Sequence, residues 1–222
     1  MTTVGLIGSG RIGGTVAKLA VAAGHAVILS NSRGPDTLQD LASQLGPLAR
    51  AGTGQDAAEG GDLVIVTIPL RAFQQVPAGP LAGKVVLDTC NYYPRRDGRI
   101  PELDSGALTS SELIQRHLAG AAVVKVFNNI FYKHLESLSR SSGAPDRSFL
   151  PIAGDDPAAK AAVTAFLDSI GYGTVDAGPL AEGWRQQPGT PVYGAPYGSF
   201  DDEKGSPASA EAVREALAAA TR

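Results

Sequence analysis

Cysteine is almost missing from this chain of 222 residues, where Cys90 is the only one. A single cysteine excludes an intrachain disulfide, so an oxidising compartment would give the fold no benefit. No apolar run approaches the roughly 20 residues that a membrane-spanning helix needs. The first residues lead directly into an apolar segment, without the charged start and cleavage site of a signal peptide. We therefore expect a cytoplasmic protein without a membrane partner.

An excess of charge of one sign is also lacking. The 19 Lys and Arg residues nearly balance the 22 Asp and Glu residues, and no basic stripe stands out. Nucleic acids and anionic membranes bind to basic surfaces, so we expect neither as a partner. We expect no metal site. The length fits one large domain, or one domain with a small C-terminal addition.

Short runs rich in Val, Ile and Leu recur through the first half and alternate with helical patterns. The runs are apolar throughout, as expected for parallel strands covered on both faces. They span residues 4–7, 26–30, 63–68, 84–88 and 123–127. Helical spacing of apolar residues predicts helices at residues 12–23 and 35–45. This alternation predicts an α/β fold with a Rossmann-like, doubly wound parallel sheet.

The second half is less regular. Residues 92–106 read as a long loop, and residues 179–198 are rich in proline and glycine. Between these loops, a predicted helix at residues 155–170 lies between strand-like segments at residues 149–153 and 172–176.

An alanine-rich tail completes the chain. From Pro207 it predicts a helix with Ser206 as its N-cap. We expect a nucleotide-binding Rossmann domain at residues 1–140. Residues 141–222 would form a small C-terminal α/β addition that packs on the site and contains the loop and the terminal helix.

A glycine-rich turn with the spacing G-x-G-x-x-G joins the first predicted strand to the first predicted helix. Gly8 makes the tight turn, Gly10 lets the backbone approach a pyrophosphate, and Gly13 lets the helix pack on the strand. The helix N-terminus offers free N–H groups and a positive partial charge. In this context the turn predicts a dinucleotide site formed by Gly8, Ser9, Gly10, Arg11, Ile12 and Gly13.

The end of the next strand distinguishes NADP from NAD. An NAD site normally has Asp or Glu there to bind the ribose 2′-OH. Here the strand leads into Asn31, Ser32 and Arg33, and Asp36 comes later. Arg33 offers a planar, permanently charged fork that matches a phosphate, and Ser32 offers a hydroxyl. We therefore predict NADP(H), although a solvated surface arginine is the simpler alternative. Arg11 is a candidate second cation.

Ligands bind beyond the carboxyl ends of the strands in an open parallel sheet. Three more segments are expected there. Their residues with candidate roles in cofactor binding or catalysis are Thr67, Ile68, Pro69, Asn91, Lys125, Asn128 and Asn129. The three asparagines are also good capping and turn residues, so a structural role stays open.

Other side chains carry weaker indications. Cys90 fits a small buried apolar position better than a redox role. Trp184, Tyr193 and Tyr197 in the proline- and glycine-rich loop would either form a wall for a flat ring or pin the loop to the domain.

Several of these segments together resemble the F420-dependent NADP reductase family, which comprises F420H2:NADP oxidoreductases and their relatives. The resemblance runs from residue 4 to about residue 180, with motifs in the same order at residues 8–13, 31–33, 67–69, 124–128, 154–156 and 176–180. It implies a Rossmann domain with a small C-terminal addition, a homodimer, and a flat ring docked on the nicotinamide. Coenzyme F420, FMN or FAD would be the co-substrate.

The chain departs from that family after residue 180. Typical F420-reducing members continue there with long apolar helices, whereas this chain continues with Trp184-Arg-Gln-Gln-Pro-Gly. The departure indicates a divergent branch and leaves the hydride acceptor open.

Three functions follow from these residues. The first is an oxidoreductase that transfers hydride between NADP(H) and a flavin or deazaflavin, since no catalytic His–carboxylate pair is evident. The second is reduction of a small carbonyl or imine, because residues 120–129 superficially resemble the Gly…Lys-x-x-Asn-Asn segment of β-hydroxyacid dehydrogenases. The valine-rich run there favours a strand over that family's helix. The third is a non-catalytic NADP(H) sensor.

Overall fold

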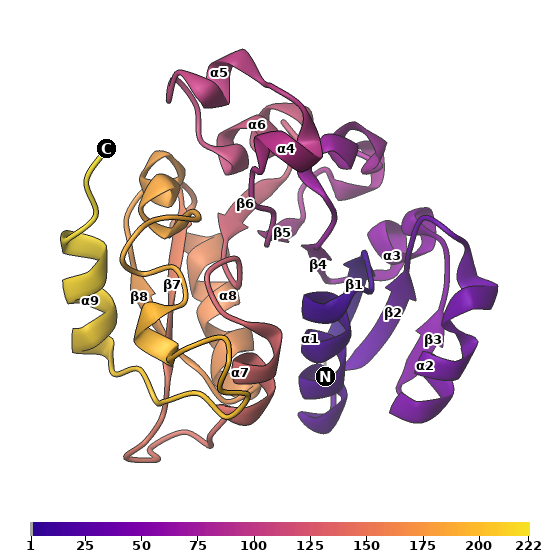
Figure 1. The fold of residues 1–222 in the computed structure, drawn as a ribbon. Coiled ribbons are helices and arrows are strands. Elements are labelled where there is room, and N and C mark those ends of the chain that lie inside the picture. The colour runs from indigo at the N-terminus through magenta and orange to yellow at the C-terminus, as the bar shows by residue number, and fades with distance from the viewer. Residues whose placement is uncertain (1) are drawn as a thin grey trace.

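Eight strands form one sheet in the computed structural model, which describes residues 2–222 (Figure 1). Their order is β3-β2-β1-β4-β5-β6-β7-β8. Neighbouring strands are parallel except for β6 and β7, which are antiparallel. The strands are β1 Thr3–Ile7, β2 Ala26–Ser30, β3 Ala49–Ala51, β4 Leu63–Val66, β5 Val85–Asp88, β6 Ala122–Lys125, β7 Phe149–Gly154 and β8 Gly173–Asp176.

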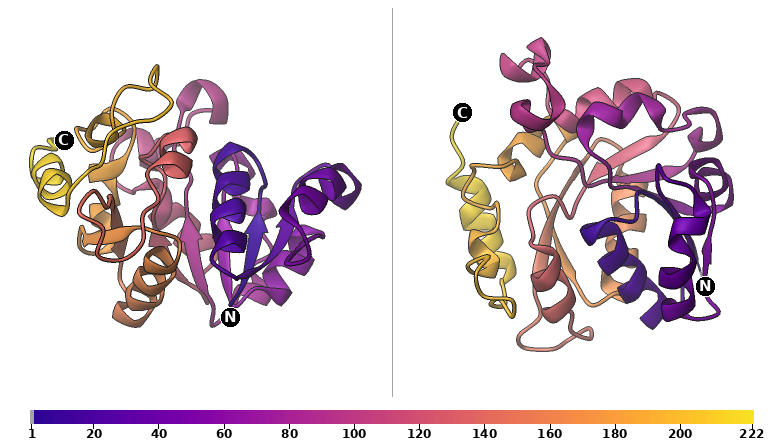
Figure 2. Two further views of the ribbon diagram at one scale, coloured as in Figure 1. Left: turned by 90° about the horizontal axis from the view of Figure 1, so that it is seen from below. Right: turned by 45° about the vertical axis from the view of Figure 1, so that its right-hand side comes forward.

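Helices cover both faces of this sheet. They are α1 Arg11–Ala22, α2 Gln39–Leu45, α3 Gly54–Gly60, α4 Pro94–Asp97, α5 Pro101–Asp104, α6 Ser110–His117, α7 Tyr132–Ser137, α8 Pro157–Ser169 and α9 Ala210–Ala218. Short 3-10 helices occur at Pro35–Leu38, Leu70–Gln75, Gly79–Leu81, Leu180–Gln186 and Ala195–Tyr197. In both views of Figure 2, α9 lies at the outer edge of the molecule, and it contacts β7 and β8.

The apolar strands divide their side chains between two cores. Ile65 and Leu87 pack into the core that also contains residues of α1, α7 and α8. Val64 and Val86 point the other way, into the core that contains residues of α3 and α6. Successive side chains of a strand alternate between faces, so a strand buried on both sides must be apolar throughout. The expected Rossmann-like doubly wound fold is confirmed.

Several local expectations are wrong. Strand β3 was not predicted, because its three residues Ala49–Ala51 are too short and too little apolar to give a pattern. Residues 92–106, expected as a loop, contain α4 and α5. The last helix is capped by Ser209, whose hydroxyl accepts a hydrogen bond from the backbone N–H of Ala212, and not by Ser206. Both serines are good N-caps, and the chain adopts helical geometry only after the second.

The C-terminal part continues the sheet. Strand β7 pairs with β6 at two positions, Val124 with Gly154 and Lys125 with Ala153, and β8 follows through α8. The division near residue 140 therefore crosses one continuous sheet, and it stays a prediction. Within residues 2–222 no helix is long and apolar enough to span a membrane.

Candidate functional site

The glycine turn joins β1 to α1 at the carboxyl edge of the sheet. Gly8 has φ +104°, and a Cβ on it would lie 2.2 Å from the carbonyl oxygen of Thr67. A Cβ on Gly13 would lie 2.3 Å from the carbonyl oxygen of Gly8. A Cβ on Gly10 would meet nothing within 4 Å. Packing of the protein itself thus requires glycine at positions 8 and 13, whereas the backbone at Gly10 faces open space.

The same turn presents free donors. Gly10 is the N-cap of α1 and provides no side-chain cap, so the N–H groups of the first turn stay available to a ligand. The Ser9 hydroxyl is used within the protein, because it donates to the carbonyl oxygen of Ser30 at 3.0 Å. This open face and its donor set fit a dinucleotide pyrophosphate.

A pocket of about 670 Å³ lies on one side of the turn, between the ends of β2 and β4. Asn31, Ser32 and Arg33 line it together with Gly8, Gly10 and Thr67, Ile68 and Pro69. The side chain of Asn31 accepts a hydrogen bond from the backbone N–H of Arg33 at 2.8 Å, which fixes the turn after β2. The Arg33 guanidinium is exposed and has no hydrogen-bond or ion-pair partner within residues 2–222.

Arg71 is a second cation of this pocket that the sequence did not reveal. It lies on the 3-10 helix Leu70–Gln75, and its guanidinium donates to the carbonyl oxygen of Arg96 at 3.0 Å. Its position two residues after Pro69 was the available signal. No Asp or Glu of residues 2–222 lines the pocket. Two arginines without a carboxylate fit a phosphate better than a free ribose diol.

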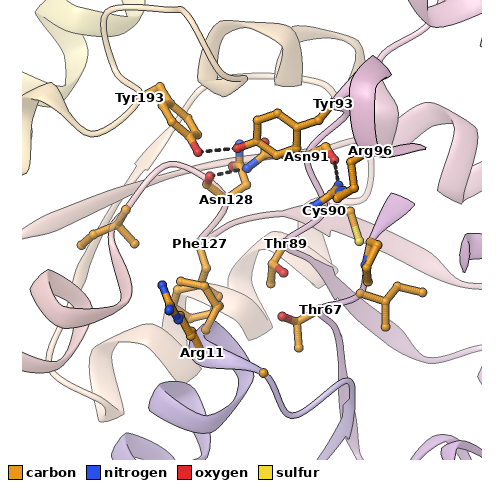
Figure 3. Close-up of a pocket in the computed structure, with 15 residues that line it drawn as sticks. Arg11, Thr67, Thr89, Cys90, Asn91, Tyr93, Arg96, Phe127, Asn128 and Tyr193 are labelled. Atoms are coloured by element: carbon orange, nitrogen blue, oxygen red, sulfur yellow. Dashed lines mark hydrogen bonds between the residues drawn. The ribbon is translucent and has the colours of Figure 1, made fainter. Parts of the chain in front are cut away.

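A second pocket, of about 330 Å³, continues from the first on the other side of the turn (Figure 3). The two share Gly10, Thr67, Ile68 and Pro69. The second pocket is also lined by Arg11, Ile12, Thr89, Cys90, Asn91, Tyr93, Arg96, Phe127, Asn128, Ile130 and Tyr193. Together they extend across the ends of β2, β1, β4, β5 and β6, where a doubly wound sheet binds its ligands.

Two asparagines predicted from the sequence meet in this second pocket. The side-chain amide of Asn91 donates to the carbonyl oxygen of Asn128 at 2.7 Å. In return, the Asn128 amide donates to the side-chain oxygen of Asn91 at 3.1 Å and to the carbonyl oxygen of Gln186 at 2.6 Å. Phe127, just before this turn, has φ +63°, a strained value for a residue with a side chain. The pair joins the ends of β5 and β6 to the C-terminal segment.

Asn129 lies outside both pockets. Its amide donates to the carbonyl oxygen of Val192 at 3.0 Å, and its own carbonyl oxygen accepts from the backbone N–H of Gly194 at 2.8 Å. These bonds hold the loop at residues 190–198 against the end of β6.

Lys125 also lies away from the pockets and is only 1% exposed. Its ammonium donates to the carbonyl oxygen of Cys90 at 3.0 Å and to the hydroxyl of Ser111 at 3.0 Å. It is 3.6 Å from the buried carboxylate of Asp88, which accepts from the backbone N–H of Cys90 at 2.8 Å. Lys125 therefore lies beneath the loop that follows β5 and does not contact the cleft, which is formed by the two pockets.

Cys90 is buried, as expected, although it borders the second pocket. Burial raises the pKa of its thiol well above the ordinary value, and the nearby Asp88 carboxylate raises it further. The thiol therefore stays protonated at neutral pH, which disfavours a nucleophilic role.

The three aromatic residues of the C-terminal loop have different surroundings. Tyr193 lines the cleft, where its hydroxyl lies 2.7 Å from that of Tyr93. Tyr197 is fully buried and donates to the carbonyl oxygen of Phe149 at 2.9 Å. Trp184 packs between the guanidinium groups of Arg185 and Arg222, with ring-centre distances of 4.6 and 4.9 Å. One of the three thus forms a wall, and two pin the loop.

A Rossmann sheet with a glycine turn and an acid-free pocket at the end of β2 defines the class of NADP-binding oxidoreductases. Residues 3–92 match the family model described as NADP oxidoreductase, coenzyme F420-dependent. The chain belongs to this family.

Solved structures extend the likeness over most of the chain. The hypothetical protein SMa0349 from Sinorhizobium meliloti is 30% identical, with a TM-score of 0.74 over 86% of this chain and 93% of that one. A protein of Arthrobacter sp. FB24 assigned to the F420-dependent NADP reductases is 26% identical, with a TM-score of 0.68 over 82% of this chain and 87% of that one.

A curated relative matches a shorter part. The Escherichia coli K12 protein YjhV is 41% identical over 51 residues, which are 23% of this chain and 37% of YjhV.

Proposed function

We propose that the protein is an NADP(H)-dependent oxidoreductase that transfers hydride between NADP(H) and a flavin or deazaflavin co-substrate. The observation that carries the proposal is the pair of adjoining pockets on either side of the glycine turn. The first holds Arg33 and Arg71 without a carboxylate, and the second is walled by Tyr93 and Tyr193.

Different residues of the first pocket would bind different parts of the cofactor. The N–H groups after Gly10 would bind the pyrophosphate, and Ser32 and Arg33 would bind the 2′-phosphate. Thr67, Ile68 and Pro69 border both pockets and would support the two riboses.

The second pocket would hold the nicotinamide against Asn91 and Asn128. Neither His nor a carboxylate lines it among residues 2–222. NADPH, when bound, supplies a hydride, and a flavin takes up this hydride and one solvent proton to reach its reduced form. The protein's contribution is then to align the two rings and exclude water, which requires no acid or base from the chain.

A panel of acceptors tests this function. Loss of NADPH absorbance would be followed with FMN, FAD, coenzyme F420 and a cyclic imine as separate acceptors, each with and without protein. We expect turnover with a flavin or deazaflavin and little with the imine. Tight NADPH binding without turnover of any acceptor would refute the proposal and favour an NADP(H) sensor.

The hydroxyl pair of Tyr93 and Tyr193 supports a second candidate, reduction of a carbonyl or imine. Such a reduction needs a proton donor near the nicotinamide. Burial raises the pKa of Tyr193, and the hydrogen bond with Tyr93 raises it further, so Tyr193 carries its proton at neutral pH. Faster turnover of the imine than of any flavin, lost in the variant Tyr193→Phe, would favour this candidate.

We also propose a homodimer and a cytoplasmic location, on the basis of the family. Light scattering of the purified protein tests the first.

A further inference from the structure

A third pocket opens beside the nicotinamide side of the cleft. It has a volume of about 460 Å³ and shares Arg11, Tyr93 and Tyr193 with the pocket of Figure 3. Its position next to the proposed nicotinamide site is where a hydride acceptor must dock.

The wall of this third pocket is aromatic. Tyr93, Phe131, Tyr132, Tyr193 and Phe200 line it, five of the 13 aromatic residues of the chain. The ring centroids of Phe131 and Phe200 are 5.5 Å apart, and those of Tyr193 and Phe200 are 6.3 Å apart. Such a cluster presents ring faces and edges that suit a planar ligand.

Phe200 is the part of this wall that faces solvent. It is 49% exposed, an unusual state for a phenylalanine that already touches three other rings. A ring bound in the third pocket would cover it and gain the corresponding apolar contact.

Two arginines supply the charge of the pocket, and they differ in their partners. The guanidinium of Arg96 binds the carboxylate of Asp97 through two hydrogen bonds of 2.9 and 2.8 Å, and also donates to the carbonyl oxygen of Asn91. Burial tends to raise the pKa of Asp97, but hydrogen bonds from Arg96 and from the Tyr93 backbone lower it below its ordinary value. Asp97 is therefore ionised at neutral pH and neutralises Arg96.

Arg11 has no such partner. Within residues 2–222 its guanidinium makes no hydrogen bond and no ion pair. It lies 5.3 Å from the centre of the Tyr132 ring, on the side of the third pocket, and it does not line the pocket at Arg33. Its position at the start of α1 adds the positive end of the helix dipole. The third pocket thus combines an aromatic wall with one unneutralised cation.

We propose that the third pocket binds the hydride acceptor and that the Arg11 guanidinium selects an acceptor whose flat ring carries an anionic group. This inference rests on the proposed function. The two parts of Arg11 would have different roles. Its backbone N–H would bind the cofactor, and its side chain would bind the acceptor.

FMN and riboflavin test the proposal, because they share one ring system and differ by a phosphate. Each flavin would be titrated into the protein saturated with NADP+, which allows binding without turnover, and binding followed by flavin fluorescence. We expect FMN to bind at least about tenfold more tightly than riboflavin, as for a hydrogen bond to a charged group. In Arg11→Ala, the affinity for FMN should fall to the riboflavin level, the affinity for riboflavin should stay unchanged, and the affinity for NADP+ should change far less than that for FMN.

Two further variants complete the design. Arg95→Ala removes an exposed arginine that lines none of the three pockets and should change neither flavin. Phe200→Ala should weaken FMN and riboflavin by the same factor, because both lose one ring contact.

The outcomes separate the inference from the function. Equal affinities of the native protein for the two flavins, or a loss of NADP+ in place of FMN in Arg11→Ala, would overturn the inference while flavin turnover persists. Absence of binding by both flavins would also overturn it. If FMN binds through Arg11 but NADPH reduces neither a flavin nor coenzyme F420, the proposed function would be contradicted and the binding assignment would stand.

Discussion

Gly8, Gly10 and Gly13 share one motif, but the reason for glycine at Gly10 differs from the reason at Gly8 and Gly13. At Gly8 and Gly13 an added Cβ would collide with backbone oxygen of the protein itself. At Gly10 it would project into open space. The fold needs the first and third glycines, whereas we propose that the second is needed by the cofactor.

This difference can be measured. Gly8→Ala should lower the free energy of unfolding by more than about 2 kcal/mol, because φ +104° and the Thr67 carbonyl both oppose a Cβ. Gly10→Ala should change it by less than about 1 kcal/mol, as for an altered N-cap. It should still weaken NADP+ at least tenfold, about 1.4 kcal/mol. Urea unfolding and NADP+ titration provide the two measurements. A Gly10→Ala protein with native NADP+ affinity would exclude the turn from the cofactor site.

Arg33 should determine the choice between the two nicotinamide cofactors. Arg33→Ala removes the charge-assisted hydrogen bond that we propose for the 2′-phosphate. It should weaken NADPH binding by about 1.5–3 kcal/mol and change NADH binding little. Arg95→Ala is the matched control. Equal losses for NADPH and NADH would refute the 2′-phosphate assignment.

The residues nearest the chemistry could be predicted only in part. The glycine turn and Asn31, Ser32 and Arg33 follow from local spacing, because a single strand end and helix start position them. Arg71 and Phe200 lie on other segments of the chain, and no sequence pattern predicts that these segments reach the cleft.

Among the elements, the ends of β5 and β6 are tied together beneath the cleft. Lys125→Met should cost about 3–5 kcal/mol of unfolding free energy, because it leaves the Asp88 carboxylate buried without its cation. Ser110→Ala removes a hydroxyl 3.3 Å from the same ammonium and should cost no more than about 1.5 kcal/mol. Denaturant unfolding measures both variants.

The Lys125→Met variant also tests whether Lys125 takes part in catalysis. A Lys125→Met protein with native stability and no turnover would contradict the structural role and return the lysine to the chemistry.

Elements with strong patterns were predictable. The five apolar runs all form strands, and the valine-rich segment before Lys125 is strand β6, as expected in preference to a helix. Short elements such as β3, α4 and α5 were missed, because three or four residues hold too little periodicity. Their positions are set by tertiary packing, which a local window does not contain.

In the whole molecule, the chain reverses direction before the long C-terminal loop. Because β7 runs antiparallel to β6 and β8 runs parallel to β7, β8 is directed away from the cleft where it ends at Asp176. Residues 177–198 then lead back to the second pocket, which Tyr193 lines. Hydrogen bonds from Asn128 to Gln186 and from Gly194 to Asn129 mark this return.

Two buried tyrosines of this C-terminal part should make the fold sensitive to alkali. Tyr172 donates to the carbonyl oxygen of Leu135 and Tyr197 to that of Phe149. Burial raises the pKa of both phenols above the ordinary value of 10.0. The unfolded chain releases these protons near pH 10 while the folded protein retains them. The two tyrosines therefore contribute their full stabilisation below about pH 10. Above that pH the free energy of unfolding declines, by up to about 1.4 kcal/mol per pH unit for each tyrosine.

Urea unfolding between about pH 9 and pH 11 measures this decline. Tyr172→Phe should lower stability by about 1 kcal/mol at pH 8, through the lost hydrogen bond, and should flatten the decline above pH 10. An unchanged slope would show that other groups cause the alkaline sensitivity.

Trp184 gives the molecule an optical reporter that needs no labelling. It is the single tryptophan of the chain, and it lies two residues before Gln186, whose carbonyl oxygen is bound by Asn128 of the cleft. Its ring also packs on Arg222 at the end of the chain. Occupation of the cleft that shifts Asn128 should alter the intrinsic fluorescence. Binding could then be followed in real time, in the native protein, through the segment that carries Tyr193 into the cleft.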